Sequence, residues 1–548
     1  MTTSDYDKPG YRVVSKKIDV YPGDKLVAKH VKLKLAGIPV FYSPVYRHNI
    51  SDQEPRFVFL PGYDSDWGAF LLSTFNHRFN DQVKIALHAD YRNHLGTGGG
   101  ADVFYNTDSF GDGLIRTYYT GEEDKNFVIP VKRDRYKVEW RHKWKIDDKT
   151  NAIWQFYKLS GPDFLKDYFE EEYDDDGNPG SFFVLTHALS KGILSLRSDV
   201  RVNRFEGKVE RLPEIKYTLN SEEIFDTGFY LKNTTTYSNL IKKSASPSSG
   251  DQKTFRIDTD SEISYPTKIG FIEFKPFVGG RFQHYSSALD GRDDGSIRGI
   301  FKTGASVSTK FYRVFDMRDS FFGEDVTKMR HIITPSINYL YQDDPTFANN
   351  KVNQFDSIDN LSNAHSVGLS LENKLQIKKG DNTIELLRAV VSSPFKFKES
   401  ASAGGFDVVK VDVDVKPLDW LSFYFDSKYD PHDRQLDEAN FDTYINGNTW
   451  RLGIGRRFND LSDDQITLDF DWKINAKWAF RIYERLDIES GRLKEQNYLL
   501  TRDLHSWKME LNYHDSRGDG SQILMAFRLK AFPELGFDFG ESINGRHR

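Results

Sequence analysis

Two short stretches carry residue types that could bind a metal ion. "HADYRNH" supplies His88, Asp90 and His94, and in a strand the first two would share a face. "EEEYDDDGNPG" (Glu170 to Gly180) is rich in carboxylates but lacks the spacing and terminal Glu of a calcium loop. We interpret the first as polar positions of a strand running into a loop, and the second as a solvated acidic loop. We therefore predict no metal site, although such carboxylates could hold divalent cations loosely beside anionic lipid.

Enzyme signatures are missing from the sequence. It has no nucleophile elbow, no Gly-rich phosphate loop and no His-Glu-x-x-His. With 81 Asp and Glu residues, some pair must lie close in space, so a glycosidase dyad is not dismissed. Nothing supports one positively. We predict no catalytic residues and no cofactor, and hence a protein that is not an enzyme.

Composition narrows the class of protein. The net charge of −6 and the pI near 6.2 give no excess of basic residues, which argues against a nucleic-acid-binding protein. The chain has no cysteine, which excludes disulfides and cysteine metal sites. Aromatic residues make up 14% although mean hydropathy is −0.60. No apolar run reaches the roughly 18 residues of a membrane helix, but a membrane barrel conceals its lipid face in every second residue. The first residues do not resemble a signal peptide, so any export signal is missing from this chain.

Period-two alternation of apolar and polar residues recurs to the end of the chain. "VDVDVKPL", "QITLDFDWKIN" and "WKMELNY" predict strands with one apolar and one charged face. Helical spacing is confined to "DFLKDYFEEEY" (Asp163 to Tyr173), with Asp163 as N-cap. From about residue 56 we expect one continuous meander of strands. The pattern favours a large antiparallel membrane barrel over a multi-domain soluble β protein.

A proline-bearing apolar stretch interrupts this pattern near the start. "AGIPVFYSPVYR" (Ala36 to Arg47) follows the alternating "KLVAKHVKLKL" and contains Pro39 and Pro44. Proline lacks the N–H that a sheet ladder needs, so the stretch is predicted to be a stiff connector, or hinge, that joins neither neighbouring ladder.

Several stretches, in order, resemble one family, the lipopolysaccharide-assembly protein LptD, also called OstA. "GIPVFYSPVYR" followed by "PRFVFLPGY" is similar to the junction between that family's periplasmic β-jellyroll and its first barrel strand. "RLPEI", "MRHIITPSINYLY" and "NQFDSIDNLSNAHSVGLSLENKL" are similar to later strands and their connection. The resemblance covers nearly the whole chain from residue 20.

The resemblance implies an all-β protein of the Gram-negative outer membrane. Residues 1–50 would be the end of the periplasmic jellyroll and the hinge, and residues 51–548 an integral barrel. The 498 residues from residue 51, at roughly 19 per strand with its loop, give about 26 strands. Three departures stand out. Only the final jellyroll strands are present, the cysteines that tie jellyroll to barrel are missing, and Pro61 is the one obvious gate proline.

The function implied is transport of lipopolysaccharide (LPS) and its assembly into the outer leaflet through a lateral gate. The gate would lie where the first strand (Arg56 to Asp64) meets the last (Gln522 to Phe532). The candidate gate residues are Val58, Phe59, Pro61, Gly62, Gly68, Leu524, Ala526 and Arg528. The candidate lipid path at the hinge comprises Ile38, Pro39, Val40, Phe41, Tyr42 and Pro44. The alternatives are that Pro61 marks a bulge or strand end, and that the hinge side chains pack the open end of the jellyroll.

By the same resemblance, the expected partners are LPS, outer-membrane lipids, a plug lipoprotein of the LptE type and a periplasmic bridge of the LptA type. The bridge would pair with a jellyroll edge that this chain mostly lacks. Two other functions stay open from the sequence: a secreted or surface β-rich carbohydrate-active enzyme, and a general outer-membrane porin or ligand-gated transporter.

Overall fold

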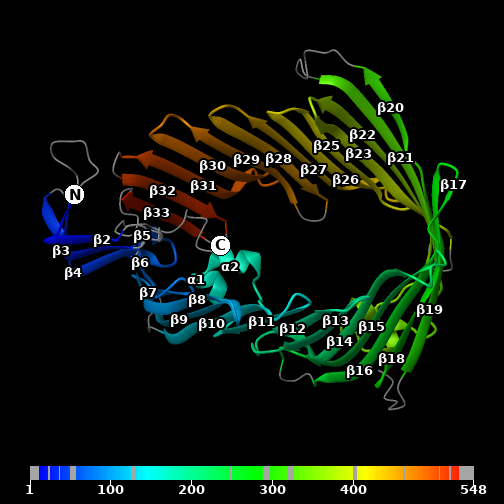
Figure 1. Cartoon of the computed structure of the whole chain (residues 1–548), viewed down its shortest axis with the longest axis horizontal. Helices are drawn as coiled ribbons and strands as arrows, with labels where there is room; N and C mark the ends of the chain where they lie inside the picture. Colours follow the sequence, from blue (N-terminus) through cyan, green and yellow to red (C-terminus); the bar gives the residue numbers. More distant parts are fainter. Residues whose placement is uncertain are drawn as a thin grey trace.

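A closed ring of antiparallel strands forms most of the molecule (Figure 1). The computed structural model describes residues 11–21, 25–35, 37–49, 57–124, 131–246, 250–287, 296–316, 326–398, 404–460, 463–504, 507–517 and 520–529. Strands β5 to β33 follow one another around the wall in chain order, and β33 returns to pair with β5. This arrangement is the single meander that the alternation predicts.

The first part of the wall consists of β5 (Phe57–Asp64), β6 (Gly68–Arg78), β7 (Val83–Arg92), β8 (Gly96–Thr107), β9 (Gly111–Asp124), β10 (Val131–Lys145), β11 (Thr150–Leu159), β12 (Ser181–Ala188), β13 (Ile193–Val200), β14 (Lys208–Glu223), β15 (Tyr230–Lys243), β16 (Gln252–Ser264), β17 (Thr267–Ile269), β18 (Ile272–Tyr285) and β19 (Ser296–Ser308).

The second part consists of β20 (Phe311–Asp316), β21 (Val326–Gln342), β22 (Ala364–Lys379), β23 (Asn382–Lys396), β24 (Gly405–Phe406), β25 (Val409–Leu418), β26 (Leu421–Asp430), β27 (Gln435–Asn446), β28 (Trp450–Asn459), β29 (Asp463–Lys473), β30 (Trp478–Asp487), β31 (Arg492–Asp503), β32 (Trp507–Ser516) and β33 (Gly520–Leu529). The short β17, β20 and β24 are bypassed by direct pairings of their neighbours, which leaves 26 strands around the barrel, the expected number.

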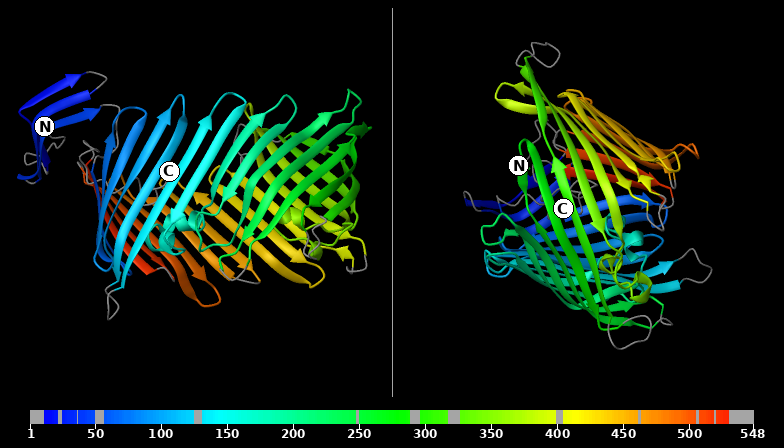
Figure 2. Two further views of the ribbon diagram at one scale, coloured as in Figure 1. Left: turned by 90° about the horizontal axis from the view of Figure 1, so that it is seen from below. Right: turned by 90° about the vertical axis from the view of Figure 1, so that its right-hand side faces the viewer.

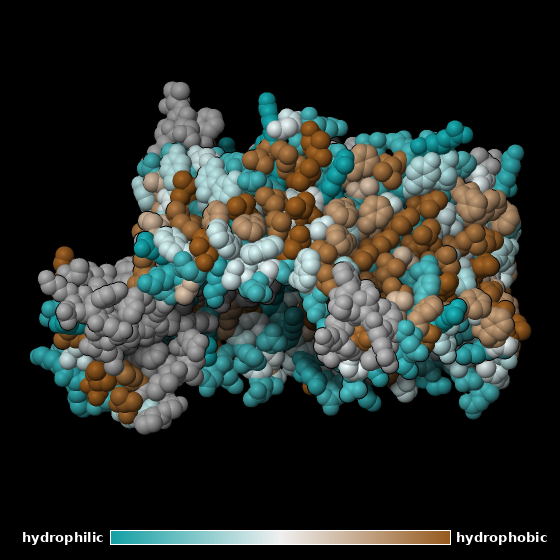
Figure 3. Space-filling model, turned by 90° about the horizontal axis from the view of Figure 1, so that it is seen from above, coloured by the Kyte–Doolittle hydropathy of each residue, from teal (hydrophilic) through white to brown (hydrophobic). Residues whose placement is uncertain are grey.

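The wall has a polar inner face and an apolar outer face. Along β16, Arg256 and Asp258 are buried toward the lumen, whereas Phe255 before them and Ile263 beyond them are exposed. The same holds across β29, where Ile466 and Trp472 are exposed. Figure 3 shows a hydrophobic band with hydrophilic rims on the face of the barrel that is seen from above. Since the apolar face points outward and not into a core, the chain is an all-β membrane barrel.

A separate small sheet precedes the barrel. It consists of β1 (Tyr11–Val14), β2 (Lys17–Tyr21), β3 (Lys25–Leu35) and β4 (Ile38–Asn49), with β3 in the centre and β4 along one edge. Figure 2 shows it beside the end of the barrel at which β5 begins, which we call the near rim. The opposite end, where β5 reaches Asp64, is the far rim.

The prediction that Pro39 and Pro44 keep their stretch out of both ladders is wrong. The stretch is β4, which pairs with β3 along its length. Both prolines sit where the ladder is irregular: Pro39 lies next to a register shift, and Pro44 faces His30, which has a positive φ and no register partner. Because β4 borders β3 on one side only, the missing N–H groups are tolerated at these positions. The connection to the barrel lies beyond Asn49, and residues 50–56 are outside the described residues.

Two connections at the far rim fold into the barrel. Residues 160–180, between β11 and β12, contain α1 (Phe164–Tyr168) and α2 (Glu170–Asp175), and we call them the luminal segment. Residues 343–363, between β21 and β22, contain η1 (Asn349–Lys351) and η2 (Ser357–Asp359). Figure 1 shows α1 and α2 inside the ring. The predicted helix is confirmed as two short helices, but Asp163 makes no side-chain cap hydrogen bond.

In the part of the chain that the structure describes, no helix has the length and apolar character to cross a membrane.

Candidate functional site

The wall has a weak seam between its first and last strands. Here β33 and β5 share three register pairs, Gln522 with Asp64, Ile523 with Tyr63, and Leu524 with Gly62. The neighbouring ladders run much further, over all eight residues of β5 with β6 and all ten of β33 with β32. Among the described residues, pairing is therefore confined to the far-rim end of the seam. The remaining length of β5 and β33 meets without a ladder.

Pro61 explains where the ladder stops. The Ser65 N–H donates to the Ser521 carbonyl at 3.0 Å, so these two residues form a hydrogen-bonded pair. Bonded pairs recur at every second residue of an antiparallel ladder, which places Tyr63 with Ile523 next and Pro61 with Met525 after that. Pro61 has no N–H to donate to Met525. The predicted loss of a donor at the seam thus falls on the side that faces β33.

Gly62 allows the two backbones to approach closely at the last paired position. A Cβ added there would lie 2.7 Å from the Ile523 carbonyl oxygen and would also overlap the Phe70 ring. Any larger residue would push β33 or Phe70 away. Gly68, predicted to weaken the second strand, instead begins β6 with a φ of +71° beside His94. It shapes the turn at the far rim.

A small apolar cluster closes the inner side of the seam. Leu60, Phe70, Leu72 and Ala526 are buried together, with Phe59, Trp67 and Leu524 packed against them. Of the other predicted gate residues, Val58 is buried and Pro61 is exposed. Arg528 lies in β33 opposite Lys508, and its side chain is outside the described part of the chain. The structure therefore gathers the predicted gate residues at one seam, with Gly68 at its turn.

The predicted hinge residues lie apart from the seam, on β4. Ile38, Pro39, Tyr42 and Pro44 are exposed, Ile38 at 66%. The Tyr42 hydroxyl lies 2.8 Å from Nδ1 of His30 on β3. Val40 and Phe41 belong to β4, but their side chains are outside the described residues. The structure presents an open apolar edge here but does not connect it to the seam.

Charged residues of the wall hold the luminal segment. Lys137 on β10 contacts both carboxylate oxygens of Glu172 at 2.8 Å, and Arg116 on β9 lies 3.3 Å from the same carboxylate. The Tyr157 hydroxyl donates to Glu172 at 2.8 Å. Burial alone would raise the pKa of Glu172, but Lys137 above all outweighs it and holds that pKa below its usual value. The prediction of a solvated acidic loop is therefore wrong for Glu172, while Asp174 to Asp176 are exposed.

The connection between β21 and β22 is anchored in the same way. Arg256, fully buried, contacts Asp356 at 2.8 Å and Asp359 at 2.7 Å. The Tyr285 hydroxyl donates to Asp359 at 2.7 Å, and Arg298 donates to the Asp359 carbonyl at 2.6 Å. The sequence "FDSIDN" in this connection is part of one of the stretches that resemble the family. That part of the motif therefore anchors the connection inside the barrel.

The three candidate side chains of "HADYRNH" each contact a different protein group. His88 lies 3.1 Å from Asp102, and Asp90 accepts from the Tyr118 hydroxyl at 2.8 Å, while His94 contacts the Asp66 carbonyl at 3.1 Å. Within the described ranges, no group of three His, Asp or Glu side chains is arranged to hold a metal ion. His88 and Asp90 are polar positions of β7, as interpreted from the sequence.

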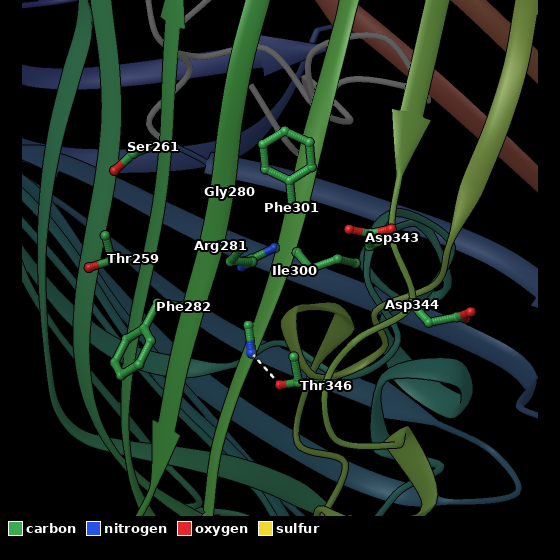
Figure 4. Close-up of a pocket in the computed structure, with 11 residues that line it drawn as sticks. Thr259, Ser261, Gly280, Arg281, Phe282, Ile300, Phe301, Asp343, Asp344 and Thr346 are labelled. Atoms are coloured by element: carbon green, nitrogen blue, oxygen red, sulfur yellow. Dashed lines mark hydrogen bonds between the residues drawn. The ribbon is translucent and has the colours of Figure 1, made fainter.

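A pocket of about 670 Å³ lies across the ring from the seam (Figure 4). It is formed by β16, β18 and β19 with the residues that follow β21. Thr346 accepts a hydrogen bond from the Gly299 N–H at its edge, and Phe282 and Phe301 are exposed beside it. None of the predicted gate or hinge residues lines this pocket.

Comparison with known proteins identifies the family. A family model described as LptD, LPS transport system D, matches residues 133–478, more than half of the chain. The chain belongs to the LptD family. It is an integral β-barrel of the outer membrane, as the outward apolar band also indicates. The family resemblance inferred from the sequence is thus confirmed.

Two LptD relatives are similar over part of the chain. LPS-assembly protein LptD of Actinobacillus pleuropneumoniae serotype 5b is 24% identical over 209 residues, which cover 36% of this chain and 26% of that protein. LPS-assembly protein LptD of Mannheimia succiniciproducens is 24% identical over 146 residues, covering 26% and 18% respectively. The match to the first thus spans about a quarter of that relative's length.

Two solved structures align with most of this chain at low TM-scores. The ferric enterobactin receptor PfeA of Pseudomonas aeruginosa, solved with enterobactin, aligns over 87% of this chain and 82% of its own, with 7% identity and a TM-score of 0.28. The P pilus usher PapC translocation pore aligns over 86% and 97%, with 8% identity and a TM-score of 0.23.

Sequence reasoning missed the contacts that join the luminal segment to the seam. Trp67 and Arg92 carry them, and neither belongs to a recognisable motif. Trp67 follows the first strand by three residues, in "GYDSDWG", where an aromatic residue in a polar turn was the one available signal.

Proposed function

We propose that this LptD-family barrel delivers lipopolysaccharide to the outer leaflet by opening sideways between β5 and β33. The observation that carries the proposal is the short seam, paired over three positions in a wall whose neighbouring ladders are long. An antiparallel ladder makes about one hydrogen bond per residue pair, and each contributes about 1 kcal/mol, more where lipid offers no replacement partner. The seam is therefore the line along which the wall separates at the lowest cost.

The two faces of the wall match the two halves of the cargo. Acyl chains would pass into the membrane through the unpaired part of β5 and β33, beside the outward-facing Met525. The sugar would remain in the lumen, whose buried lining includes Arg256, Asp258 and Glu139. Such an arrangement keeps charged groups out of hydrocarbon throughout the transfer.

In this proposal the near rim faces the periplasm. Residues 1–50 would be the end of a periplasmic jellyroll, and residues 51–548 the barrel. The small sheet supports this assignment because it lies outside the barrel sheet, beside the near rim. Lipid would arrive along the exposed edge of β4, and a bridge protein of the LptA type would supply it. A lipoprotein of the LptE type would enter the lumen as a plug.

Photo-crosslinking tests whether lipid passes the seam. A photoreactive residue replaces Met525, which is exposed beside the seam, in cells that depend on this chain. The matched control places the same residue at Leu369 on β22, which is similarly exposed on the outer face away from the seam. We expect LPS adducts at position 525 during active transport and few at position 369. Equal labelling at both positions would show that LPS meets the barrel only as surrounding lipid.

A further inference from the structure

Trp67 joins the luminal segment to the turn that ends β5. Its indole N–H donates to the Asp167 carbonyl at 2.9 Å, and its ring stacks on Tyr168 at a centroid distance of 6.5 Å. The Arg92 guanidinium lies 4.4 Å from the Trp67 ring and 5.0 Å from the Tyr168 ring, between the two elements. These residues come from the β5–β6 turn, from α1 and from β7, so three elements meet at one aromatic and cationic contact.

The luminal segment is firmly held on its other side. Asp167 lies 2.5 Å from Arg135, which also contacts Glu122 at 3.2 Å. Tyr168 and Phe164 are buried in a cluster with Tyr118 and Leu159 of the wall. Together with the Lys137 and Glu172 contact, these interactions fix α1 to β9, β10 and β11. The carbonyl to which Trp67 donates is therefore anchored to the wall well away from the seam.

The turn that carries Trp67 also contacts the seam. One carboxylate oxygen of Asp64 accepts the Asp66 and Trp67 N–H groups at 2.8 and 3.0 Å, and the other accepts from Gln522 of β33 at 3.4 Å. The Trp67 ring also packs edge-on against Phe70, a member of the seam cluster, at 5.2 Å. A displacement of Trp67 must therefore disturb the pairs that hold β33.

We propose that Trp67 is a positioning residue that couples the luminal segment to the seam. While α1 is docked, Trp67 holds the β5–β6 turn where Asp64 and Tyr63 can pair with β33. When α1 leaves its place, the turn loses its support and the far-rim end of the seam separates. The role of this coupling in transport rests on the proposed function. The coupling itself is a property of the barrel alone.

The charged residues that dock the luminal segment indicate which kind of cargo would act on the coupling. The segment is docked by carboxylates, Asp167 and Glu172, on Arg135, Arg116 and Lys137. An anionic saccharide in the lumen would compete for the same three cations. Cargo that reaches this level of the lumen would thereby release the seam ahead of it.

Disulfide trapping measures the state of the seam directly. Tyr63 and Ile523 are directly opposed, and the chain has no other cysteine to interfere with the pair Y63C/I523C. The purified barrel in detergent is exposed to a mild oxidant, and the cross-linked fraction is followed by its altered migration on denaturing gels. A closed seam traps rapidly, and a separated seam traps slowly.

Two variants and one matched control decide the result. W67F removes the indole N–H but keeps a ring, and we expect trapping to slow about fivefold, as for the loss of one hydrogen bond. E172K displaces the luminal segment without touching β5, and we expect a larger effect than for W67F. W144F removes an indole N–H that donates to the Ser109 carbonyl at 3.1 Å, far from the seam, and should change nothing.

Unchanged trapping in both W67F and E172K would overturn the coupling. Slower trapping in W67F alone would also overturn it, because the effect would then be local to the turn. Neither result would bear on the proposed function, which depends on LPS passing the seam and is tested in cells.

Discussion

The replacement Gly62→Ala should open the seam. Gly62 lies opposite Leu524 at the last paired position. An added Cβ would stand 2.7 Å from the Ile523 carbonyl oxygen, a separation that real Cβ atoms do not show, and would overlap the Phe70 ring. The Phe70 ring is buried among Leu60, Leu72 and Ala526, so it has little room to yield. We expect β33 to move away instead.

The size of the effect follows from the bonds at risk. The paired end holds the Ser65–Ser521 bond and the two bonds of the Tyr63–Ile523 pair. At about 1 kcal/mol each, their loss costs about 3 kcal/mol, or a shift of about 150-fold in the ratio of closed to open seams. The adjacent ladders of β5 with β6 and of β33 with β32 are untouched, so the barrel itself should persist.

Trapping of Y63C/I523C reports this shift. In the Gly62→Ala background we expect little cross-linked product under conditions that trap the parent barrel fully, while heat-modifiable migration on gels is retained. Gly368→Ala is the matched control, because its Cβ would lie an ordinary 3.6 Å from the Asn338 carbonyl oxygen of the neighbouring strand. Parent-like trapping in Gly62→Ala would refute the reasoning that close backbone approach at Gly62 sustains the seam.

Four further predictions concern Pro61, the luminal segment, the buried Arg256 and the edge of β4. Pro61→Ala restores a donor toward Met525 and should speed Y63C/I523C trapping while slowing LPS delivery; unchanged trapping would show that Pro61 does not end the ladder. The pKa of Glu172 is held below its usual value, so docking of the luminal segment should be complete above the usual Glu pKa and be lost as the pH falls through the lowered pKa of Glu172. The loss would be seen as faster hydrogen exchange in α1 and α2; Glu172→Gln should remove this pH dependence, and its persistence would assign it to another group. Arg256→Met removes the cation that pairs with the buried Asp359 and should destabilise the barrel by about 3–5 kcal/mol, which would lower the temperature at which gel mobility is lost; Arg481→Met, at an exposed pair with Asp471, is the control and should change little. Ile38→Asp places a charge on the open edge of β4 and should reduce LPS delivery with normal barrel formation; normal delivery would remove this edge from the lipid path.

The barrel could be predicted because its strands have one periodic property. The alternation of apolar and polar residues in stretches such as "QITLDFDWKIN" does not depend on the loops that connect the strands. Every strand must hide one face from water or from lipid. The place of Pro61 and Gly62 at the junction of the first and last strands could also be predicted, since a proline lacks an N–H and a glycine lacks a Cβ.

What could not be predicted depends on pairing partners. Pro39 and Pro44 were expected to break a ladder, but β4 is an edge strand and its ladder with β3 is irregular at both positions. Glu172 was expected in solvent, because nothing in "EEEYDDDGNPG" shows that Lys137 on β10 and Arg116 on β9 contact it. Trp67 was missed for the same reason: its partner Asp167 lies 100 residues away.

A covalent lock across the seam tests lateral opening most directly. Continuing the register places Leu60 opposite Ala526, and both belong to the buried seam cluster, so the pair L60C/A526C bridges the unpaired part of the wall. The control pair L511C/M525C bridges β32 and β33, where the ladder is complete. In cells that depend on this chain, the first lock should abolish new LPS at the cell surface until a reductant is added, and the second should leave it unchanged. Undiminished surface LPS with L60C/A526C fully oxidised would contradict the lateral gate.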